Sequence, residues 1–167
     1  MANRRDNLGV TLVEMLVVVG ILTLLAGFIV SLTLRFDTQS KERDLTGIFL
    51  LLKSALMEYQ EEMGGFPEQP EKDFGTVDDE YDKAHDHAEL MYEKLNSIPA
   101  SRQVLKRVNG VFVRGDLSDD DPLKIYDGWG SVLDYRYDPN DGNFPELISA
   151  GPDKEFETTD DISSKDI

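Results

Sequence analysis

A single glutamate, Glu14, lies inside the otherwise uncharged apolar run Val10–Leu34. A carboxylate in the middle of a bilayer costs about 3 kcal/mol on insertion scales, so it needs either polar surroundings or a cation. One interpretation places Glu14 near the membrane interface, where it reaches polar headgroups. In the other, cleavage after Gly9 gives Val10 a free α-amine, and Glu14 of one copy pairs with that amine on an adjacent copy. Such an ion pair is strongest where water is scarce.

A second set of carboxylates lies close together near the end of the chain. Five acidic residues fall within nine positions: Asp153, Glu155, Glu157, Asp160 and Asp161. Calcium takes about six to eight oxygen ligands, and a loop of this kind could curl around the ion. The spacing is not that of an EF-hand, however, because the D-x-D-x-D-G pattern is missing. By composition alone, a solvated acidic tail is favoured over a calcium site.

Other patterns that would carry catalysis or bind metal are absent or weak. The chain has no cysteine, which excludes disulfides, thiolate metal sites and cysteine nucleophiles. His85 and His87 would point to different sides of a helix, so we expect exposed residues in a loop or at a helix entry, not a metal site. No G-x-S-x-G, H-E-x-x-H, P-loop or G-x-G-x-x-G pattern occurs, and nothing in the sequence argues for an enzyme.

The charge is distributed unevenly along the 167 residues. The net charge is −16, while residues 1–35 sum to +1, so residues 36–167 carry −17. A body this acidic repels nucleic acids and anionic lipid surfaces, which argues against a role in binding DNA or RNA. It suits solubility, cation binding or basic partners.

The apolar run is long enough to cross a membrane. It has 25 residues, and about 20 suffice for a spanning helix. Arg4 and Arg5 precede it, so the positive-inside rule predicts a cytoplasmic amino terminus with the rest of the chain outside. A secretory signal peptide would have a shorter apolar core followed by the small cleavage-site residue. Here Gly9 comes before the run, so cleavage there would leave the hydrophobic helix on the mature protein.

The spacing of apolar residues predicts one long helix from about Thr11 to about Met63. Its first half is apolar on all sides, and its second half has a single apolar stripe at three- and four-residue spacings. Gly64, Gly65 and Pro67 form a stop signal. The predicted core residues of the second half are Leu45, Ile48, Phe49, Leu52, Ala55, Leu56 and Tyr59.

Shorter elements follow. The segment 68–87 is charged and predicts an exposed loop, while 84–99 predicts a second helix with Ala88, Leu90, Met91 and Leu95 towards the core. A short helical turn is expected at 101–108. From residue 110 the pattern alternates with period two, which predicts a small antiparallel sheet packed on the amphipathic half of the long helix. The tail from residue 152 is expected to be an acidic loop.

The stretch "GVTLVEML" resembles the type IV prepilin signature, which is shared by type IV pilins and the pseudopilins of type II secretion. The shared features are a short basic leader, a glycine, a hydrophobic first mature residue and a glutamate at the fifth mature place. In that family a prepilin peptidase cuts after the glycine and methylates the new amine. The resemblance therefore assigns Gly9 and Val10 to the processing site and Glu14 to filament assembly. Ser31 lies where many members have a proline, which leaves the helix melting tied to that proline in doubt.

Two further stretches are similar to the major pseudopilin. "LLKSALMEYQEEMGGFPEQ" resembles the end of its long helix, and "YDGWGSVLDYRYDP" is similar to its strand-turn-strand, with Gly128 in place of a proline. Trp129 and Tyr135 are interpreted simply as core aromatics. The major pseudopilin also has a calcium loop, and "SAGPD" and "DDI" stand in corresponding places. The resemblance thus implies calcium held by Asp153, Asp160 and Asp161 with backbone carbonyls.

Together these features predict an α+β, type IV pilin-like fold with five parts. These are a basic leader (1–9), a hydrophobic filament-core helix (10–34), the amphipathic half of that helix (35–67), a variable helix and loop region (68–121), and an antiparallel sheet with the acidic carboxyl-terminal loop (122–167). The resemblance implies a pseudopilus subunit, most similar to the major pseudopilin of type II secretion. Its implied partners are further copies of itself, prepilin peptidase, the inner-membrane assembly platform and minor pseudopilins. It would be anchored in the inner membrane and form a periplasmic filament, without nucleic acid.

Three alternatives remain open at this stage. The first is a subunit of a true type IV pilus for adhesion, motility or DNA uptake. The second is a membrane-anchored calcium binder that never polymerises. The third is a membrane-tethered hydrolase that uses two of the many carboxylates.

Overall fold

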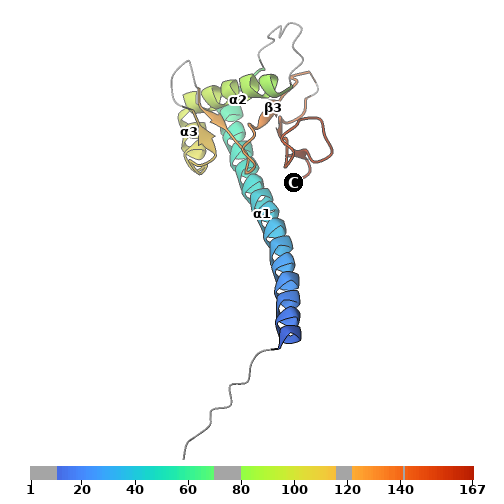
Figure 1. Ribbon diagram of the computed structural model, residues 1–167. Coiled ribbons are helices and arrows are strands. Elements are labelled where there is room, and N and C mark those ends of the chain that lie inside the picture. The colour runs from blue at the N-terminus through green and yellow to red at the C-terminus, as the bar shows by residue number, and fades with distance from the viewer. Residues whose placement is uncertain (1–10, 70–79, 116–121, 141) are drawn as a thin grey trace, which may run out of the picture. The chain divides into compact units, whose positions relative to one another are not determined.

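The described part of the chain combines one long helix with two short helices and two small antiparallel sheets (Figure 1). The structure, a computed structural model, describes residues 11–69, 80–115, 122–140 and 142–167, without the side chains of 30–36 and 80–81. Two compact units are present, Met1–Gln39 and Ser40–Ile167, and each is considered by itself. This α+β architecture is the pilin-like fold expected from the sequence.

Helix α1 extends from Leu12 to Met63. It begins one residue after the predicted start, because Thr11 caps it, and it ends where the glycine pair was expected to end it. Gly64 has φ 79°, and its N–H donates to the carbonyl of Gln60 at 2.8 Å. A left-handed glycine directly after the last helical turn is a common helix terminator, since glycine adopts positive φ without a Cβ clash.

The core of the second unit forms against one face of α1. All seven α1 residues predicted to face the core are at most 7% exposed. Met91 and Leu95 of the following helix and Leu133, Tyr135 and Leu147 of the strands complete the cluster. The period of the apolar residues therefore identified the buried face correctly. Among the four α2 positions predicted for the core, only Leu90 is half-buried instead of buried.

Two short helices follow α1. Helix α2 covers Glu80–Ser97, and helix α3 covers Pro99–Leu105. Helix α2 confirms the helix predicted from residue 84, but it begins four residues earlier, so the loop prediction was wrong for residues 80–83. Packing explains the difference, because Ala84 and Ala88 bury their side chains against Val132. Pro99 begins α3 at a position where its missing N–H costs nothing.

The strands form two sheets instead of the single sheet predicted. β1 (Val113–Arg114) pairs with β2 (Lys124–Ile125), and β3 (Asp134–Arg136), β4 (Glu146–Ser149) and β5 (Ile162–Ser163) pair in that order. All pairings are antiparallel. The bridge Tyr126↔Val132 is the link between the sheets in the described residues, because the intervening turn interrupts the ladder. Strand β5 also lies in the tail that was expected to be entirely loop.

Candidate functional sites

The described amino end of α1 is closed by a reciprocal pair of hydrogen bonds between Thr11 and Glu14. The backbone N–H of Glu14 donates to the Thr11 hydroxyl at 3.2 Å, and the Thr11 N–H donates to Glu14 Oε2 at 3.3 Å. The Thr11 hydroxyl also lies 3.3 Å from Oε2. This is a capping box, in which two otherwise unpaired helix-end donors are satisfied. Gly9 and Val10, the predicted processing residues, lie outside the described residues.

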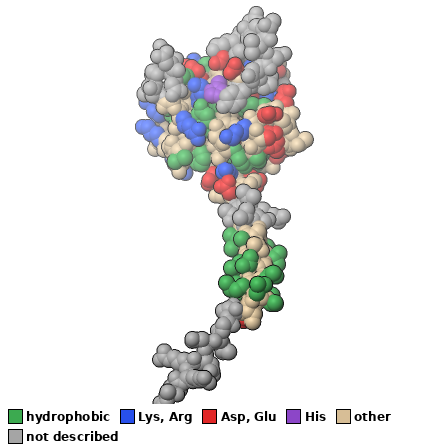
Figure 2. Space-filling view, in the orientation of Figure 1, with side chains coloured by type: hydrophobic (Ala, Val, Ile, Leu, Met, Phe, Trp, Pro, Cys, Tyr) green, Lys and Arg blue, Asp and Glu red, His purple; other side chains and the backbone are tan. Residues whose placement is uncertain are grey.

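The apolar part of α1 has its side chains exposed in this single chain. The window Leu12–Ile29 has a mean hydropathy of 2.6 and none of it is buried, so it is long and apolar enough to cross a membrane. Figure 2 shows hydrophobic side chains around this part of the helix. The one hydroxyl group there, on Thr23, donates to the carbonyls of Val19 at 3.0 Å and Gly20 at 2.9 Å. The helix thus presents no unsatisfied side-chain donor in this window, and its apolar surface requires a lipid or protein partner.

These observations place Glu14 in the capped first turn of a helix whose following residues are apolar and exposed. Residues 4–30 match the prokaryotic N-terminal methylation motif. The chain carries a type IV pilin-like signal. The motif indicates a structural subunit that prepilin peptidase processes and that polymerises, and the exposed helix is consistent with a membrane anchor. No curated protein and no solved structure matches the chain.

The turn after β2 is organised by the buried carboxylate of Asp127, which is 1% exposed. Its Oδ1 accepts the backbone N–H groups of Trp129 at 2.9 Å, Gly130 at 2.7 Å and Ser131 at 2.8 Å. Its Oδ2 accepts the hydroxyl hydrogen of Ser149 on β4 at 2.6 Å. Four donors therefore replace water around the charge, which is how a buried carboxylate without a cation is tolerated.

The same turn contains a position, Gly128, that has no room for a side chain. A Cβ on Gly128 would lie 2.8 Å from the Cβ of Lys41 on α1, closer than real Cβ atoms pack. The helix and the turn therefore approach so closely that position 128 has no room for a side chain. Tyr135 lies in the core as expected, and its hydroxyl donates to the carbonyl of Pro67 at 2.7 Å. Trp129 is half-buried against the same core.

The carboxyl-terminal loop brings the three predicted calcium ligands into one small region. Asp160 accepts the N–H of Asp153 at 3.1 Å and the Thr158 hydroxyl hydrogen at 2.6 Å, and Asp161 accepts the N–H of Glu157 at 2.8 Å. The loop closes at Gly151, which has φ 65° and whose Cβ, if present, would clash with the Asp160 carbonyl. The acidic tail is thus folded by its own carboxylates and backbone N–H groups.

One carboxylate oxygen in this loop lacks a partner. Asp161 Oδ1 is buried and accepts no hydrogen bond. Burial raises the pKa of Asp161 above its usual range, the N–H of Glu157 opposes the rise, and the charges of Asp153 and Asp160 add to it. Within the described residues, no three His, Cys, Asp or Glu side chains come close enough together to hold a metal ion. A calcium ion here would therefore depend on backbone carbonyl oxygens in addition to these aspartates.

The two histidines do not occupy the exposed positions predicted for them. Both lie on α2, and the side chain of His87 is only 15% exposed, with its Nδ1 2.8 Å from Asp134 Oδ1. Arg136 Nε donates to the other oxygen of Asp134 at 2.6 Å. Burial alone would raise the pKa of Asp134, but the hydrogen bonds from His87 and Arg136 outweigh it and lower the pKa. His87 therefore joins α2 to β3. This role was not predicted from the sequence.

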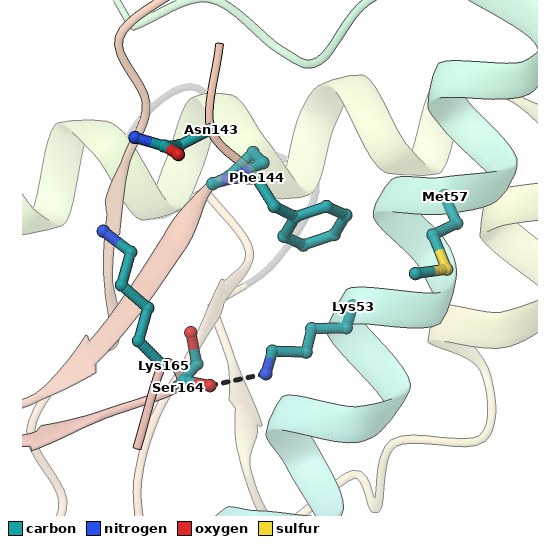
Figure 3. A pocket seen from close by; sticks show the side chains of 7 residues that line it. Lys53, Met57, Asn143, Phe144, Ser164 and Lys165 are labelled. Atoms are coloured by element: carbon teal, nitrogen blue, oxygen red, sulfur yellow. Dashed lines mark hydrogen bonds between the residues drawn. The ribbon is translucent and has the colours of Figure 1, made fainter. Parts of the chain in front are cut away.

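Several pockets lie beside these elements, and one of about 710 Å³ is lined by His87 and Asp138 among others. Another, about 550 Å³, lies between α1 and the carboxyl-terminal strands (Figure 3). Met57 and Phe144 face it, and Lys53 Nζ donates to the Ser164 carbonyl at 2.5 Å, which ties α1 to the end of the chain. A third, about 260 Å³, is lined by His87, Arg136, Glu146 and Lys165 among others. Its Glu146 and Lys165 pair at 2.7 Å, so these charges neutralise each other instead of facing a substrate.

Two groups that organise these sites, the Thr11–Glu14 capping box and the carboxylate of Asp127, were not predicted from the sequence. The T-x-x-E spacing of Thr11 and Glu14 is the capping-box pattern and was readable in the sequence. Asp127 is different, because nothing local distinguishes it from the chain's many other acidic residues. Its importance comes from Ser149, which lies 22 positions away in the sequence.

Proposed function

We propose that this chain is the structural subunit of a pilus-like filament and, within that class, the major pseudopilin of a type II secretion system. The observation that carries the proposal is the methylation motif at residues 4–30, together with the part of α1 from Leu12 to Ile29, whose apolar side chains all remain exposed in the single chain. An apolar surface of this length needs many copies to bury it once it leaves the bilayer. Other copies of α1 supply such a surface, since helices that are apolar all round pack against one another.

Processing would convert the membrane anchor into a filament subunit. Cleavage after Gly9 removes Arg4 and Arg5 and leaves a positively charged amine on Val10. Glu14 is already held by its own Thr11 N–H, so the isolated subunit keeps its carboxylate satisfied. On assembly, the Val10 amine of an adjacent copy adds a full charge to that carboxylate. This ion pair forms only when two copies meet, and it guides docking of the next subunit.

The proposal places the chain in the inner membrane as a single-pass protein. The leader 1–9 faces the cytoplasm, and the described globular unit faces the periplasm. After assembly the apolar helices form the filament interior, and the assembly platform and minor pseudopilins are the expected further partners. The filament then acts mechanically to promote the export of folded proteins.

Mass spectrometry of the mature chain tests the processing step directly. We expect a chain that begins with N-methylated Val10. Recovery of native protein that still carries Met1 and both leader arginines, always as single copies, would contradict the filament function.

Substitution of Glu14 tests assembly separately from insertion. Glu14→Ala is expected to leave membrane insertion intact and abolish filaments, because the docking ion pair is lost. Glu61→Ala, an exposed glutamate on the same helix, is the matched control and should assemble normally. Filaments of normal abundance from the Glu14→Ala chain would contradict the docking role of Glu14. A wild-type chain that inserts and forms no filaments would instead support a bitopic protein that does not polymerise.

The choice of a secretion pseudopilus over a type IV pilus rests on the two stretches that resemble the major pseudopilin. In this structure the first contains the buried face of α1 and the second contains the turn organised by Asp127. The gene neighbourhood separates the two functions. Genes for an outer-membrane secretin together with secreted cargo support the pseudopilus, whereas genes for twitching motility support the type IV pilus.

We also propose that calcium binds the carboxyl-terminal loop through Asp153, Asp160 and Asp161 together with backbone carbonyls. The buried, unpartnered Oδ1 of Asp161 supports this, because a cation would supply the missing partner. Bound calcium would fix the loop against β5 and, through it, the surface that the subunit presents.

A thermal unfolding experiment tests the calcium proposal. Calcium is expected to raise the Tm of the wild-type chain, and a chelator should reverse the increase. Asp161→Asn should be close to neutral without calcium, because it removes a poorly satisfied charge, and it should lose the response to calcium. An unchanged Tm of the wild type in calcium and in chelator would contradict the proposal.

A further inference from the structure

One stretch of this acidic protein carries only basic charges. Residues 94–115 contain five basic and no acidic residues, while the whole chain has a net charge of −16. The basic residues are Lys94, Arg102, Lys106, Arg107 and Arg114. A cationic segment with no internal counter-charge is expected to face an anionic partner, because like charges gathered on one surface repel one another unless they are compensated.

Helix α3 and the turn after it display part of this charge on the surface. Arg102 donates from Nε to the Asn96 carbonyl at 2.6 Å and from Nη2 to the Ser97 carbonyl at 3.2 Å, so it closes the end of α2. These acceptors are neutral, and among the described residues Arg102 forms no ion pair. Lys106 and Arg107 are exposed, and neither forms an ion pair within the described part of the chain.

An exposed apolar side chain, that of Val111, follows Arg107 by four positions in the chain. Val111 is 68% exposed, although it immediately precedes Phe112 and Val113, which pack against the core. An apolar residue surrounded by polar and charged groups is the arrangement found in protein interfaces, where the apolar centre is desolvated and the charged rim selects the partner. We call Lys106, Arg107 and Val111 the basic end.

The carboxyl-terminal loop has the opposite charge and lies at the other end of α2. Phe156 packs against the cluster that Ala84 and Ala88 in the first half of α2 form with Val132, whereas Arg102 binds the last residues of that helix. Because α2 has 18 residues, its ends are about 27 Å apart. Figures 1 and 2 show the same separation, with α3 and Lys or Arg side chains on one side and the carboxyl-terminal loop and Asp or Glu side chains on the other.

The exposed carboxylates of that loop are available for a partner. Glu155 and Glu157 are exposed, and their backbone N–H groups donate to the carboxylates of Asp153 and Asp161 respectively. Their own carboxylates accept no hydrogen bond and form no ion pair from any residue that the structure describes. Neither glutamate is one of the proposed calcium ligands. Both side chains are therefore accessible to a second copy.

We propose that the basic end of one subunit binds the carboxyl-terminal loop of a second copy, with Lys106 and Arg107 facing Glu155 and Glu157 and Val111 at the centre of the contact. This inference rests on the proposed filament function and adds a specific contact between globular units. Two different surfaces meet in it, so the contact is heterologous, and heterologous contacts that do not close into a ring generate open helical polymers. A single copy cannot make the contact with itself, because α2 holds the two surfaces apart.

A second copy fits this surface better than the other common polyanions. The net charge of −16 gives this chain a long-range repulsion from nucleic acids and anionic lipid surfaces. A second copy also carries −16. However, the helix anchor holds copies in one membrane at high effective concentration, and short-range pairing then outweighs a repulsion that salt screens within about 8 Å. The attraction between the basic end and the loop offsets part of the repulsion between stacked acidic units.

Cysteine cross-linking tests the contact, because the chain has no native cysteine. The full-length Arg107→Cys/Glu155→Cys chain, expressed in the native cells and oxidised, should give a ladder of dimers, trimers and longer species. Each single substitution should give dimers at most. Arg43→Cys/Glu155→Cys, which pairs the loop with a different exposed arginine, is the matched control and should give no ladder. An intrachain partner of the basic end would likewise give no ladder.

A charge exchange tests the same contact without cross-linking. Lys106→Glu/Arg107→Glu and Glu155→Lys/Glu157→Lys are each expected to reduce filament yield at least about tenfold. The chain that carries all four changes should recover to within about threefold of the wild type, because opposite charges again face each other.

The outcomes separate this inference from the function on which it rests. A chain that is processed at Val10 and forms filaments, yet gives no ladder and no recovery on charge exchange, overturns this contact and leaves the filament function standing. A cross-link from the cysteine introduced by Arg107→Cys to a different protein also overturns it. Failure of the wild-type chain to be processed or to polymerise would instead overturn the filament function itself.

Discussion

The carboxylate of Glu14 accepts the backbone N–H of Thr11 at 3.3 Å, and Thr11 in return accepts the N–H of Glu14. The residue assigned to contacts between subunits therefore has an intramolecular role first. This pairing lowers the cost of holding a charge next to an apolar helix, because it supplies hydrogen-bond donors that the bilayer lacks. It also fixes the position of the carboxylate at the end of the helix, where the amine of a neighbour would approach.

Removal of the Thr11 hydroxyl should loosen the first turn of α1. Thr11→Val is expected to weaken the helix cap by about 1 kcal/mol, or roughly fivefold in the protection of the Glu14 amide from hydrogen exchange. NMR of the protein in detergent micelles measures this. Thr11→Ser keeps the hydroxyl and serves as the control. Equal protection of the Glu14 amide in wild type and Thr11→Val would show that the cap contributes nothing.

Asp127 should be one of the most sensitive positions in the globular unit. Asp127→Ala leaves the N–H groups of Trp129 and Ser131 and the Ser149 hydroxyl without an acceptor, and the Gly130 N–H keeps only the carbonyl of residue 127 at 3.3 Å. We therefore expect a loss of at least about 3 kcal/mol in the free energy of unfolding. Urea unfolding of the unit Ser40–Ile167 measures it. Ser149→Ala removes only one of the four bonds and should cost about 1 kcal/mol.

An exposed aspartate provides the comparison for Asp127. Asp138 also accepts a backbone N–H, that of Asn140 at 2.8 Å, but on the surface. Asp138→Ala should therefore change the free energy of unfolding by less than about 0.5 kcal/mol. Similar losses at positions 127 and 138 would contradict the view that burial of the carboxylate decides the effect.

Gly151→Ala should disrupt the carboxyl-terminal loop. Two penalties combine at this position: φ is 65°, which disfavours any Cβ, and the new methyl would overlap the Asp160 carbonyl. We expect a loss of about 2–4 kcal/mol in unfolding experiments on Ser40–Ile167. Gly142→Ala isolates the first penalty, because Gly142 has φ 67° with nothing within 4 Å, and it should cost only about 1 kcal/mol. Equal losses would show that the close approach to Asp160 is unimportant.

The stability contributed by Asp134 should depend on pH in the acid range. Its pKa is lower in the folded protein than in the unfolded chain, so its contribution is fully present above the unfolded pKa of about 4 and disappears as the pH falls through the lower folded value. At pH 7 Asp134→Asn should cost roughly 1–3 kcal/mol. The difference between wild type and variant should stay constant from about pH 7 to about pH 5 and shrink below about pH 4.

Unfolding curves of the two proteins at each pH measure that difference. Asp138→Asn, at an exposed position, controls for the general effect of acid on so acidic a chain. A wild-type advantage that persists undiminished to about pH 2 would mean that the Asp134 carboxylate is not the group responsible.

The long helix could be predicted from the sequence because its information is local. The apolar run after Glu14, the seven core positions from Leu45 to Tyr59 and the glycine stop after Met63 all follow from a repeat of about 3.6 residues and its end signal. The methylation motif is local in the same way, since leader charge, Gly9 and Glu14 lie within a few residues. Such patterns keep their meaning whatever the rest of the chain does.

The carboxyl-terminal half depended on contacts that the sequence does not display. The split into two sheets, the strand β5 in the tail and the burial of His87 against Asp134 each join residues far apart in the chain. Short strands of two to four residues carry too little pattern to fix their partners, so pairing is decided by packing against α1 and α2. The sequence shows that residue 127 is acidic, but it does not show that this side chain is buried.

The sequence by itself determined that this chain has an amino-terminal helix of two characters and a signal for processing. Only the tertiary structure decided which of its many carboxylates are structural, because burial and hydrogen-bond donors from distant residues set the environment of each one. It also placed α3, with Arg102, and the acidic loop at opposite ends of α2. That separation is a property of the folded unit, since a linear charge pattern has no direction in space until the helices and strands pack.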